Sequence, residues 1–343
     1  MSSIDIPEVL RNVASKASGL PPAGLTILPR NPLEIQSNRL YDIHADHRHL
    51  IAKEYILPNE LQEAPVREFK ALQLLSSLDI APQPVFFEPS IAPIVVYEYM
   101  EGEMWDRRKP EGKDLANLAK SWLKIHSVPS DWLSRGSERS LDEIEAGLRE
   151  RIAEYTGWVT KEFEPGRRAA AICQELLDSR HKLVQELACL NSTLYFCRSD
   201  PRFANVIQRP DGRIGFVDWE DSGLRDPARE LADILMHPNQ EDLESWAEWK
   251  EFLEPYIAVQ GKVDDSLVER MRIYLAIFPI FWLTNLMSRG IRLASVGKLD
   301  GWKVNGVPGN VRMRRFLARA LAWPDMNYAD QLDTLGEVKF FGC

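Results

Sequence analysis

The hydrophobic pattern of this chain changes near residue 100, and that change constrains the fold more than any other feature. Before it, short apolar runs bounded by polar residues are typical of β-strands. After it, apolar residues recur at the spacing of helix turns. A length of 343 residues fits two domains or one bilobal enzyme. The pattern therefore predicts a bilobal α+β protein, with a β-rich lobe at residues 1–99 and a larger, mainly helical lobe at residues 100–343.

The first lobe is predicted to hold a five-stranded antiparallel sheet and one helix, after a lead-in that carries a short helix. Apolar positions from Val66 to Leu78 recur at helical spacing, and prolines follow them. A polar turn at Ala45–Arg48 separates two of the strands. The strands are expected at residues 33–35, 40–43, 50–52, 85–87 and 94–97.

The second lobe is predicted to be helical with one β-rich island. Helical spacing is found at residues 115–126, 141–155, 169–190 and 267–288. The island comprises strand-like runs at residues 193–196, 206–207 and 214–217. It interrupts the helical half of the chain and carries its most informative polar residues.

Charge and cysteine content exclude several classes of protein. A net charge of −9 argues against nucleic-acid and anionic-membrane partners, because both favour a basic surface. The four cysteines form no C-x-x-C pair, so neither a zinc ribbon nor a disulfide scaffold is indicated. The most apolar window, Ile273–Leu283, is shorter than the roughly 20 residues that span a bilayer. We expect a cytoplasmic protein; the sequence carries no signal for an oligomeric state.

Three oxygen-bearing side chains flank the strands of the island. Asp200 and Asn205 lie on a loop after one strand, and Asp218 lies at the end of another. A metal ion that bridges nucleotide phosphates needs hard oxygen ligands, which Asn205 and Asp218 supply. An acceptor hydroxyl needs a carboxylate to orient it and take its proton, and Asp200 is the free candidate. The three residues therefore predict metal-dependent phosphoryl transfer.

These residues belong to an ordered run of motifs. R-S-D-P-R-F-A-N at 198–205 precedes V-D-W-E at 217–220 and D-P-A-R-E-L-A at 226–232. The run resembles the H-G-D-x-x-x-x-N, I-D-W-E and G-D-P-x-x-D-L-A pattern of the aminoglycoside phosphotransferase and choline kinase family. The resemblance covers roughly Leu33 to Asp233. It implies a protein-kinase-like fold, Mg²⁺, and transfer of the γ-phosphate of ATP or GTP to a hydroxyl of a small aminoglycoside- or choline-like substrate, cationic ones included.

The resemblance also implies which residues hold the nucleotide. Lys53 matches the third-strand lysine that binds the α- and β-phosphates, and Glu68 matches the helix glutamate that holds this lysine. Backbone groups from Glu98 to Met100 resemble the hinge that hydrogen-bonds the purine.

The segment expected to cover the phosphates has no glycine. It runs from residue 36 to residue 40, and Ser37 and Asn38 are expected to act there through side chains and backbone amides. The catalytic loop also departs from the family, with Arg198 and Ser199 where histidine and glycine are usual.

Two residues near the predicted triad have roles that the sequence leaves open or only suggests. Arg202 stands in the place of a family basic residue and could stabilise the charge on the transferring phosphate. Glu220 follows Asp218 by two residues, so a place in the metal shell, an orienting role and a structural role all remain open.

Two other functions also remain open. A pseudokinase-type nucleotide-binding or scaffold protein without transfer activity is suggested by Arg198 and by the glycine-free turn. A metal-dependent phosphohydrolase could also use clustered aspartates. Such an enzyme has no need of Lys53, Glu68 and the hinge-like stretch.

Overall fold

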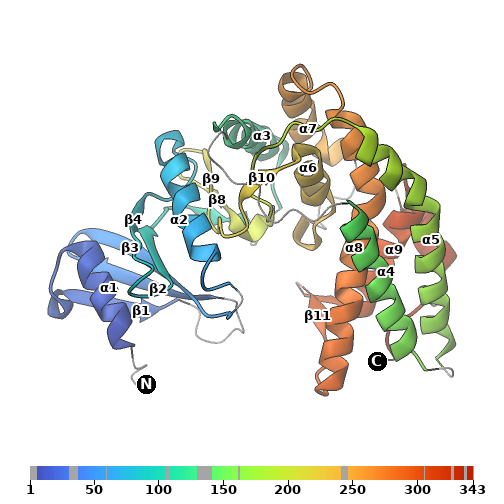
Figure 1. The fold of residues 1–343 in the computed structure, drawn as a ribbon, viewed down its shortest axis with the longest axis horizontal. Helices are drawn as coiled ribbons and strands as arrows, with labels where there is room; N and C mark the ends of the chain where they lie inside the picture. Colours follow the sequence, from blue (N-terminus) through green and yellow to red (C-terminus); the bar gives the residue numbers. More distant parts are fainter. Residues whose placement is uncertain are drawn as a thin grey trace. The chain divides into compact units, whose positions relative to one another are not determined.

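The computed structural model of the chain forms two compact units (Figure 1). The first comprises Met1–Pro110, Lys120–Ser134 and Phe196–Leu224, and the second comprises Glu111–Ala119, Arg135–Tyr195 and Arg225–Cys343. Helix α3 (Gly112–His126) is divided between them. The structure describes residues 6–30, 38–58, 60–105, 109–129, 141–160, 163–240, 246–304, 306–325, 328–335 and 338–342.

Among the described residues, the first unit contains two whole helices, the end of α3 and most of the strands. Its helices are α1 (Glu8–Ser18) and α2 (Ala64–Leu75), and its short 3₁₀ turns are η1 (Pro22–Gly24), η2 (Ser76–Leu78) and η4 (Phe203–Asn205). Its strands are β1 (Leu25–Pro29), β2 (Asn38–Ala45), β3 (Arg48–Tyr55), β4 (Pro84–Phe86), β5 (Ile94–Glu98), β6 (Glu103–Met104), β8 (Val206–Gln208) and β9 (Ile214–Phe216), with most of β7 (Tyr195–Cys197) and β10 (Gly223–Arg225).

Five of these strands form one antiparallel sheet in the order β1-β2-β3-β5-β4. The sequence predicts its first strand at residues 33–35, which lie outside the described residues, whereas the strand present is β1. Prolines on both sides of residues 25–29 are typical of a lead-in and not of a strand. Proline is nevertheless tolerated at an edge strand, where no ladder hydrogen bond is lost, and Pro29 ends such a strand.

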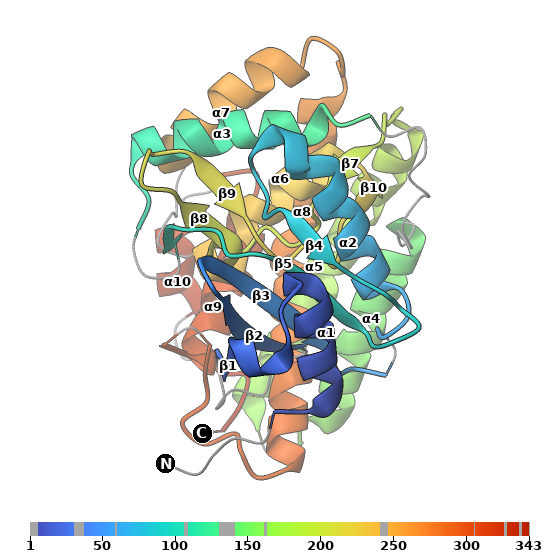
Figure 2. The same ribbon diagram turned by 90° about the vertical axis from the view of Figure 1, so that its left-hand side faces the viewer.

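Side chains of β3 alternate between the two faces of this sheet, and each face packs against a different helix. Leu50 and Ala52 join residues of helix α1 in a buried apolar cluster. Figure 2 shows this helix lying over the sheet. Lys53 and Tyr55 point to the opposite face, because successive side chains of a strand alternate. Both of them contact Glu68 of α2. The buried lysine is therefore placed by the period of the strand that carries it.

A second, three-stranded sheet ties later segments to the first hundred residues. Its order is β6-β8-β9, with Met104 paired to Ile207. The Phe216 N–H also donates to the Ile80 carbonyl at 2.8 Å. Because of these bonds, residues 196–224 share one compact unit with the N-terminal sheet. This grouping differs from the predicted division at residue 99.

The second unit is mainly helical. In Figure 1, helices α4, α5, α8 and α9 run side by side. The elements of this unit, besides the start of α3, are α4 (Leu141–Trp158), α5 (Glu164–Cys189), α6 (Pro227–Met236), η5 (Pro238–Gln240), α7 (Trp246–Gln260), α8 (Leu267–Ser295), β11 (Lys303–Val304), β12 (Val307–Pro308), α9 (Gly309–Ala322) and α10 (Ala329–Leu335).

Helix α8 is the apolar centre of the second unit. Its 29 residues continue beyond the apolar window at Ile273–Leu283, and by length and composition it could cross a membrane. However, 78% of its most apolar 18-residue window is buried inside the structure. That burial is typical of the core helix of a globular unit.

Arg270 of α8 lies in a buried ion-pair cluster. Its Nε and Nη2 atoms donate to the two carboxylate oxygens of Asp226 at 3.0 Å each. Two further bonds, of 2.9 and 2.7 Å, go to Asp264. Asp226 also caps α6 by accepting from the Ala228 N–H at 2.9 Å, and Pro227 follows at the first helical position. One guanidinium therefore joins the start of α6 to α8.

Replacing Arg270 with methionine should strongly destabilise the protein. Arg270 is 1% exposed, and removing one partner leaves buried carboxylates without their counter-charge, which typically costs about 3–5 kcal/mol. Urea denaturation followed by circular dichroism would measure the loss. As a control, Arg167→Met removes an exposed partner of Glu164 on α5, and its effect should stay below about 1 kcal/mol. Equal effects of the two changes would contradict this account.

Candidate active site

The centre of the site is the ammonium group of Lys53 on β3. Its Nζ atom lies 2.7 Å from Glu68 Oε2, 2.5 Å from Asp218 Oδ1 and 2.9 Å from Glu220 Oε2. The lysine side chain is only 4% exposed. Glu68 comes from α2, and the other two carboxylates come from the loop after β9. One buried cation thus meets three carboxylates from two different segments.

These charges shift one another's pKa values. Burial alone would lower the pKa of Lys53, but the carboxylates of Asp218 and Glu68 outweigh it and hold that pKa well above its usual range. Burial would raise the pKa of Asp218, but the Lys53 and Arg202 cations lower it. For Glu68 burial prevails over Lys53, and its pKa is raised. Lys53 and Asp218 are therefore both charged at neutral pH.

The loop that carries Asp200 brings together the predicted polar triad. Asn205, at the end of η4, donates through Nδ2 to Asp200 Oδ2 at 3.0 Å and to Asp218 Oδ2 at 3.5 Å. Arg202 Nε donates to the Asp200 oxygens at 3.0 and 2.8 Å, and Arg202 Nη2 lies 3.3 Å from Asp218 Oδ2. The triad therefore converges on one point, with Arg202 beside it.

Asp200, the candidate predicted to orient the acceptor hydroxyl, is already paired within its own loop. Its two oxygens accept hydrogen bonds from Arg202 and Asn205. The physical reason is local, since Arg202 is two residues away on the same loop and its planar guanidinium can meet both oxygens of a carboxylate. Arg202 is 42% exposed, whereas Asp200 is 16% exposed.

Two residues of this loop system have left-handed backbone conformations without being glycine. Ser199 has φ = 66° and Asp218 has φ = 67°. Such a conformation strains a residue with a Cβ atom, and it persists where the surroundings hold it. The left-handed conformation of Asp218 turns the chain just after β9, where the Asp218 carboxylate contacts Lys53. The left-handed turn at Ser199 explains why a glycine is usual at this place in the family.

Glu220 connects the start of β2 to the lysine cluster. Asn38, which is buried, donates through Nδ2 to Glu220 Oε2 at 2.7 Å. Arg67 Nε donates to the backbone carbonyl of Glu220 at 2.7 Å. The predicted partner Ser37 lies outside the described residues. Glu220 thus holds the end of the segment predicted to cover the phosphates.

The predicted hinge follows β5. The N–H of Glu98 donates to the Gln83 carbonyl and that of Tyr99 to the His49 carbonyl, both at 2.9 Å. The Glu98 side chain is about half exposed and lies 3.6 Å from Arg48. Within the described part of the chain, the Met100 N–H makes no such bond to a backbone carbonyl. The contact of Met100 with a purine remains a prediction.

The donor atoms of the site suit a magnesium ion. The carboxylates of Glu68, Asp218 and Glu220 each offer an oxygen, and these oxygens lie within 4.8 Å of one another. The amide of Asn205 lies beside Asp218. Mg²⁺ prefers oxygen ligands of this kind, supplied by one or two carboxylates together with phosphate and water. The residues present therefore fit the ion that the motifs imply.

Sequence reasoning missed one member of the cluster. The hydroxyl of Tyr55 donates to Glu68, so that this carboxylate has two side-chain partners from β3. The Trp219 N–H adds a longer bond of 3.5 Å to the other Glu68 oxygen. Tyr55 follows Lys53 by two residues, and the period of a strand could have placed both on one face.

A strand lysine paired to a helix glutamate, together with loop aspartates in an α+β fold, defines the class of kinase-like phosphotransferases. The model of the phosphotransferase enzyme family matches residues 31–273. The chain belongs to this family, and the predicted resemblance is confirmed. A search of the curated proteins finds no match.

Solved structures of small-molecule kinases share the fold. Choline kinase LicA from Streptococcus pneumoniae aligns with a TM-score of 0.56 at 19% identity, covering 87% of this chain and 94% of that chain. A choline kinase from Cryptosporidium parvum Iowa II gives 0.62 at 16%, with coverages of 96% and 99%. Spectinomycin phosphotransferase, in complex with ADP and spectinomycin, gives 0.56 at 17%, with coverages of 87% and 92%. The predicted protein-kinase-like α+β class is thereby confirmed.

Replacing Lys53 with methionine should destabilise the protein in a pH-dependent way. Without the ammonium, the pKa values of the buried carboxylates rise above their unfolded values, so stability falls as pH rises through them. The loss in the free energy of unfolding, relative to the wild type, should be largest at pH 7–8. It should shrink as pH falls, by up to about 1.4 kcal/mol per pH unit for each proton that the carboxylates take up. Urea denaturation from pH 5 to 8 in metal-free buffer measures it. A pH-independent difference would contradict the prediction.

Replacing Ser199 with glycine should stabilise the fold. A left-handed conformation costs an L-residue roughly 1–2 kcal/mol, and the greater freedom of glycine in the unfolded chain offsets part of that. The expected net gain is about 0.5–1 kcal/mol in the free energy of unfolding, measured by urea denaturation. The control is Ser179→Gly inside helix α5, where glycine should instead cost about 0.5 kcal/mol. A loss of stability in Ser199→Gly would refute the strain argument.

Proposed function

We propose that this protein is a small-molecule kinase that transfers the γ-phosphate of ATP or GTP to a hydroxyl group. The observation that carries the proposal is the ion pair between Lys53 and Glu68, formed beside Asp218 in the same cluster. A flexible lysine stays directed at phosphates only when a carboxylate holds it, and this pairing is a requirement of kinase catalysis. Membership of the phosphotransferase family supports the same reaction.

The nucleotide would be held by the segments around β2, β3 and β5. Lys53 would contact its α- and β-phosphates, and the Met100 N–H would donate to the purine. Asn38, already held by Glu220, would lie at the edge of the phosphate site. These roles correspond to those of the nucleotide-binding segments that kinases share.

Asn205 and Asp218 would hold Mg²⁺, with Glu220 as a further carboxylate within reach. When bound, such an ion neutralises the negative charge that builds up on the phosphates. The roles of Lys53 and Arg202 are complementary, since both bring positive charge to the same group of oxygens.

Asp200 would orient the acceptor hydroxyl and take its proton. The acceptor oxygen then forms a bond to the γ-phosphorus, while the bond from that phosphorus to the β–γ bridging oxygen breaks and the nucleoside diphosphate leaves. Arg202 already lies against Asp200 and Asp218, where its charge would stabilise the transferring group. Substrate binding has to take over part of the Arg202–Asp200 contact.

The acceptor that we propose is a small alcohol that also carries an amine or ammonium group. Two of the similar structures are choline kinases, and a third holds ADP and spectinomycin. A net charge of −9 is compatible with such a cation. We place the activity in the cytoplasm, because the described cysteines Cys173, Cys189 and Cys197 are free thiols.

Kinase activity should be measurable and should depend on Asp200. Purified protein with Mg²⁺ and ATP or GTP would be tested on a panel of amino alcohols, aminoglycosides and sugars. The release of ADP or GDP would be measured. Asp200→Asn removes the proton acceptor and should lower kcat by roughly 10²–10⁴-fold. Asp211→Asn, at the exposed hairpin between β8 and β9, is the control and should leave kcat unchanged. Equal turnover in wild type and Asp200→Asn would contradict the mechanism.

A nucleotide-binding protein without transfer activity is the second candidate. The bonds of Asp200 to Arg202 favour it, because they occupy the oxygens that would take a proton. A protein of this kind would still be stabilised by nucleotide in thermal denaturation, since ligands that bind the folded state raise its stability. It would show no turnover with any acceptor.

A further inference from the structure

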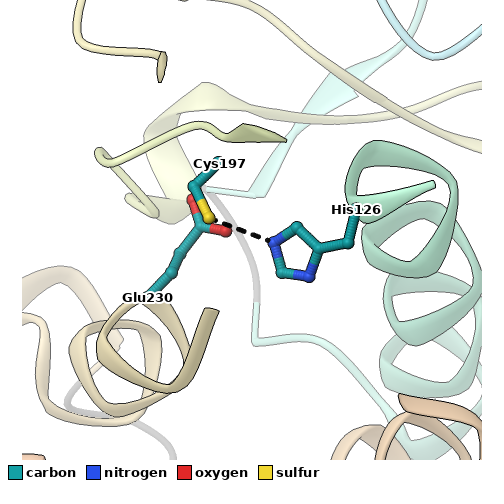
Figure 3. Close-up of side chains that lie close together, drawn as sticks. All are labelled: His126, Cys197 and Glu230. Carbon is teal, nitrogen blue, oxygen red and sulfur yellow. Dashed lines mark hydrogen bonds between the residues drawn. The ribbon is translucent and has the colours of Figure 1, made fainter. Parts of the chain in front are cut away.

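Arg198 is a fully buried arginine at the start of the catalytic loop. It follows strand β7 directly, lies two residues before Asp200, and has no exposed surface. The preceding residue, Cys197, is also buried, and its sulfur lies 3.5 Å from Nε2 of His126 at the end of α3 (Figure 3). The end of β7 is therefore anchored, and Arg198 starts from a well-defined place.

Three aromatic rings surround the guanidinium group of Arg198. Its central carbon lies 4.8 Å from the ring centre of Phe216, 5.0 Å from that of Trp219 and 5.9 Å from that of Trp122. Aromatic faces attract a cation, and arginine suits such a site because its planar group stacks on rings and keeps its charge when buried. This enclosure restricts the directions in which the guanidinium can donate hydrogen bonds.

One of those hydrogen bonds reaches the segment of Asp218. Arg198 Nη2 donates to the Val217 carbonyl at 2.9 Å. That carbonyl belongs to the peptide group whose nitrogen is part of Asp218, the residue with φ = 67°. On the other side, the Val217 N–H donates to the Asn205 carbonyl at 3.1 Å. The orientation of the strained peptide is thus held by Arg198 and by the backbone next to it.

We infer that Arg198 is a positioning residue, which keeps the Val217–Asp218 peptide in the orientation that directs the Asp218 carboxylate to Lys53 and to a metal ion. The inference rests on the proposed function, because it concerns how Asp218 binds the metal of a metal–nucleotide complex. Arg198 itself contacts neither nucleotide nor acceptor in this account. It acts through the backbone, and its aromatic enclosure gives it a fixed orientation.

The alternative is that Arg198 only stabilises the core. Loss of a buried arginine lowers stability in either case, so stability cannot separate the two roles. Metal affinity can, because a group that orients a metal ligand typically changes affinity 10–100-fold when it is removed. Arg312 on α9 is a matched control, since it is 2% exposed and donates to the backbone carbonyl of Pro238 within the second unit.

The test compares Mn²⁺ binding in the presence of ADP by wild type, Arg198→Met and Arg312→Met, using electron paramagnetic resonance of free Mn²⁺. Circular dichroism would first establish that each variant is folded. We expect Mn²⁺ to bind Arg198→Met at least about 10-fold more weakly than wild type. Arg312→Met should bind like wild type despite its lower stability. Unchanged Mn²⁺ affinity in Arg198→Met would overturn the inference and leave the proposed function intact.

Chemical rescue provides a second readout if Arg198→Met does not fold. Arg198→Lys keeps the charge but lacks the planar fork, so it should fold and still bind Mn²⁺–ADP more weakly than wild type. In Arg198→Ala, millimolar guanidinium should restore part of the Mn²⁺ affinity, while ammonium should not. Wild-type affinity in Arg198→Lys would overturn the inference. Absence of metal-dependent ADP binding in wild type would overturn the proposed function as well.

Discussion

The organisation of the first unit depends on one buried ammonium group. Lys53 lies within 2.9 Å of carboxylate oxygens from Glu68, Asp218 and Glu220. Three carboxylates in such a small volume repel one another and are costly to remove from water unless a cation compensates them. Lys53 supplies that cation, and through it the sheet, helix α2 and the loop after β9 are held together. The charges that bind the lysine are also those that suit a metal ion.

A second constraint is backbone strain next to those charges. Ser199 and Asp218 are both held in left-handed conformations, in the two loops that carry the proposed catalytic and metal-binding residues. Strain of this kind persists at functional sites because neighbouring groups enforce it. The hydrogen bond from Arg198 to Val217 is one such restraint. Two buried cations therefore position groups of this site. Lys53 pairs directly with carboxylates, and Arg198 donates to the backbone next to Asp218.

The local sequence pattern was sufficient to predict much of this site. It failed where burial or strand pairing depends on segments that are distant in the chain. The order of motifs identified Lys53, Glu68 and Asp218, and the structure brings them into contact. The strand β1 was missed because prolines at its end and on both sides of it resemble those of a loop, and only pairing with β2 identifies it as an edge strand. Arg312 lies in a run of arginines on α9, a pattern more typical of a solvated helix face, yet it is 2% exposed in the packed second unit.

The sequence by itself determined which chemical groups are present, their order, and the periodicity that forms the strands and helices around them. Those properties are local, since a lysine on a strand and a glutamate on a helix can be recognised from their neighbours. Only the tertiary structure decided which polar groups pair. Asp200 accepts hydrogen bonds from Arg202, and Glu220 accepts one from Asn38, which lies 182 residues away in the chain. Pairing depends on distances between folded segments, and no local pattern in the chain contains those distances.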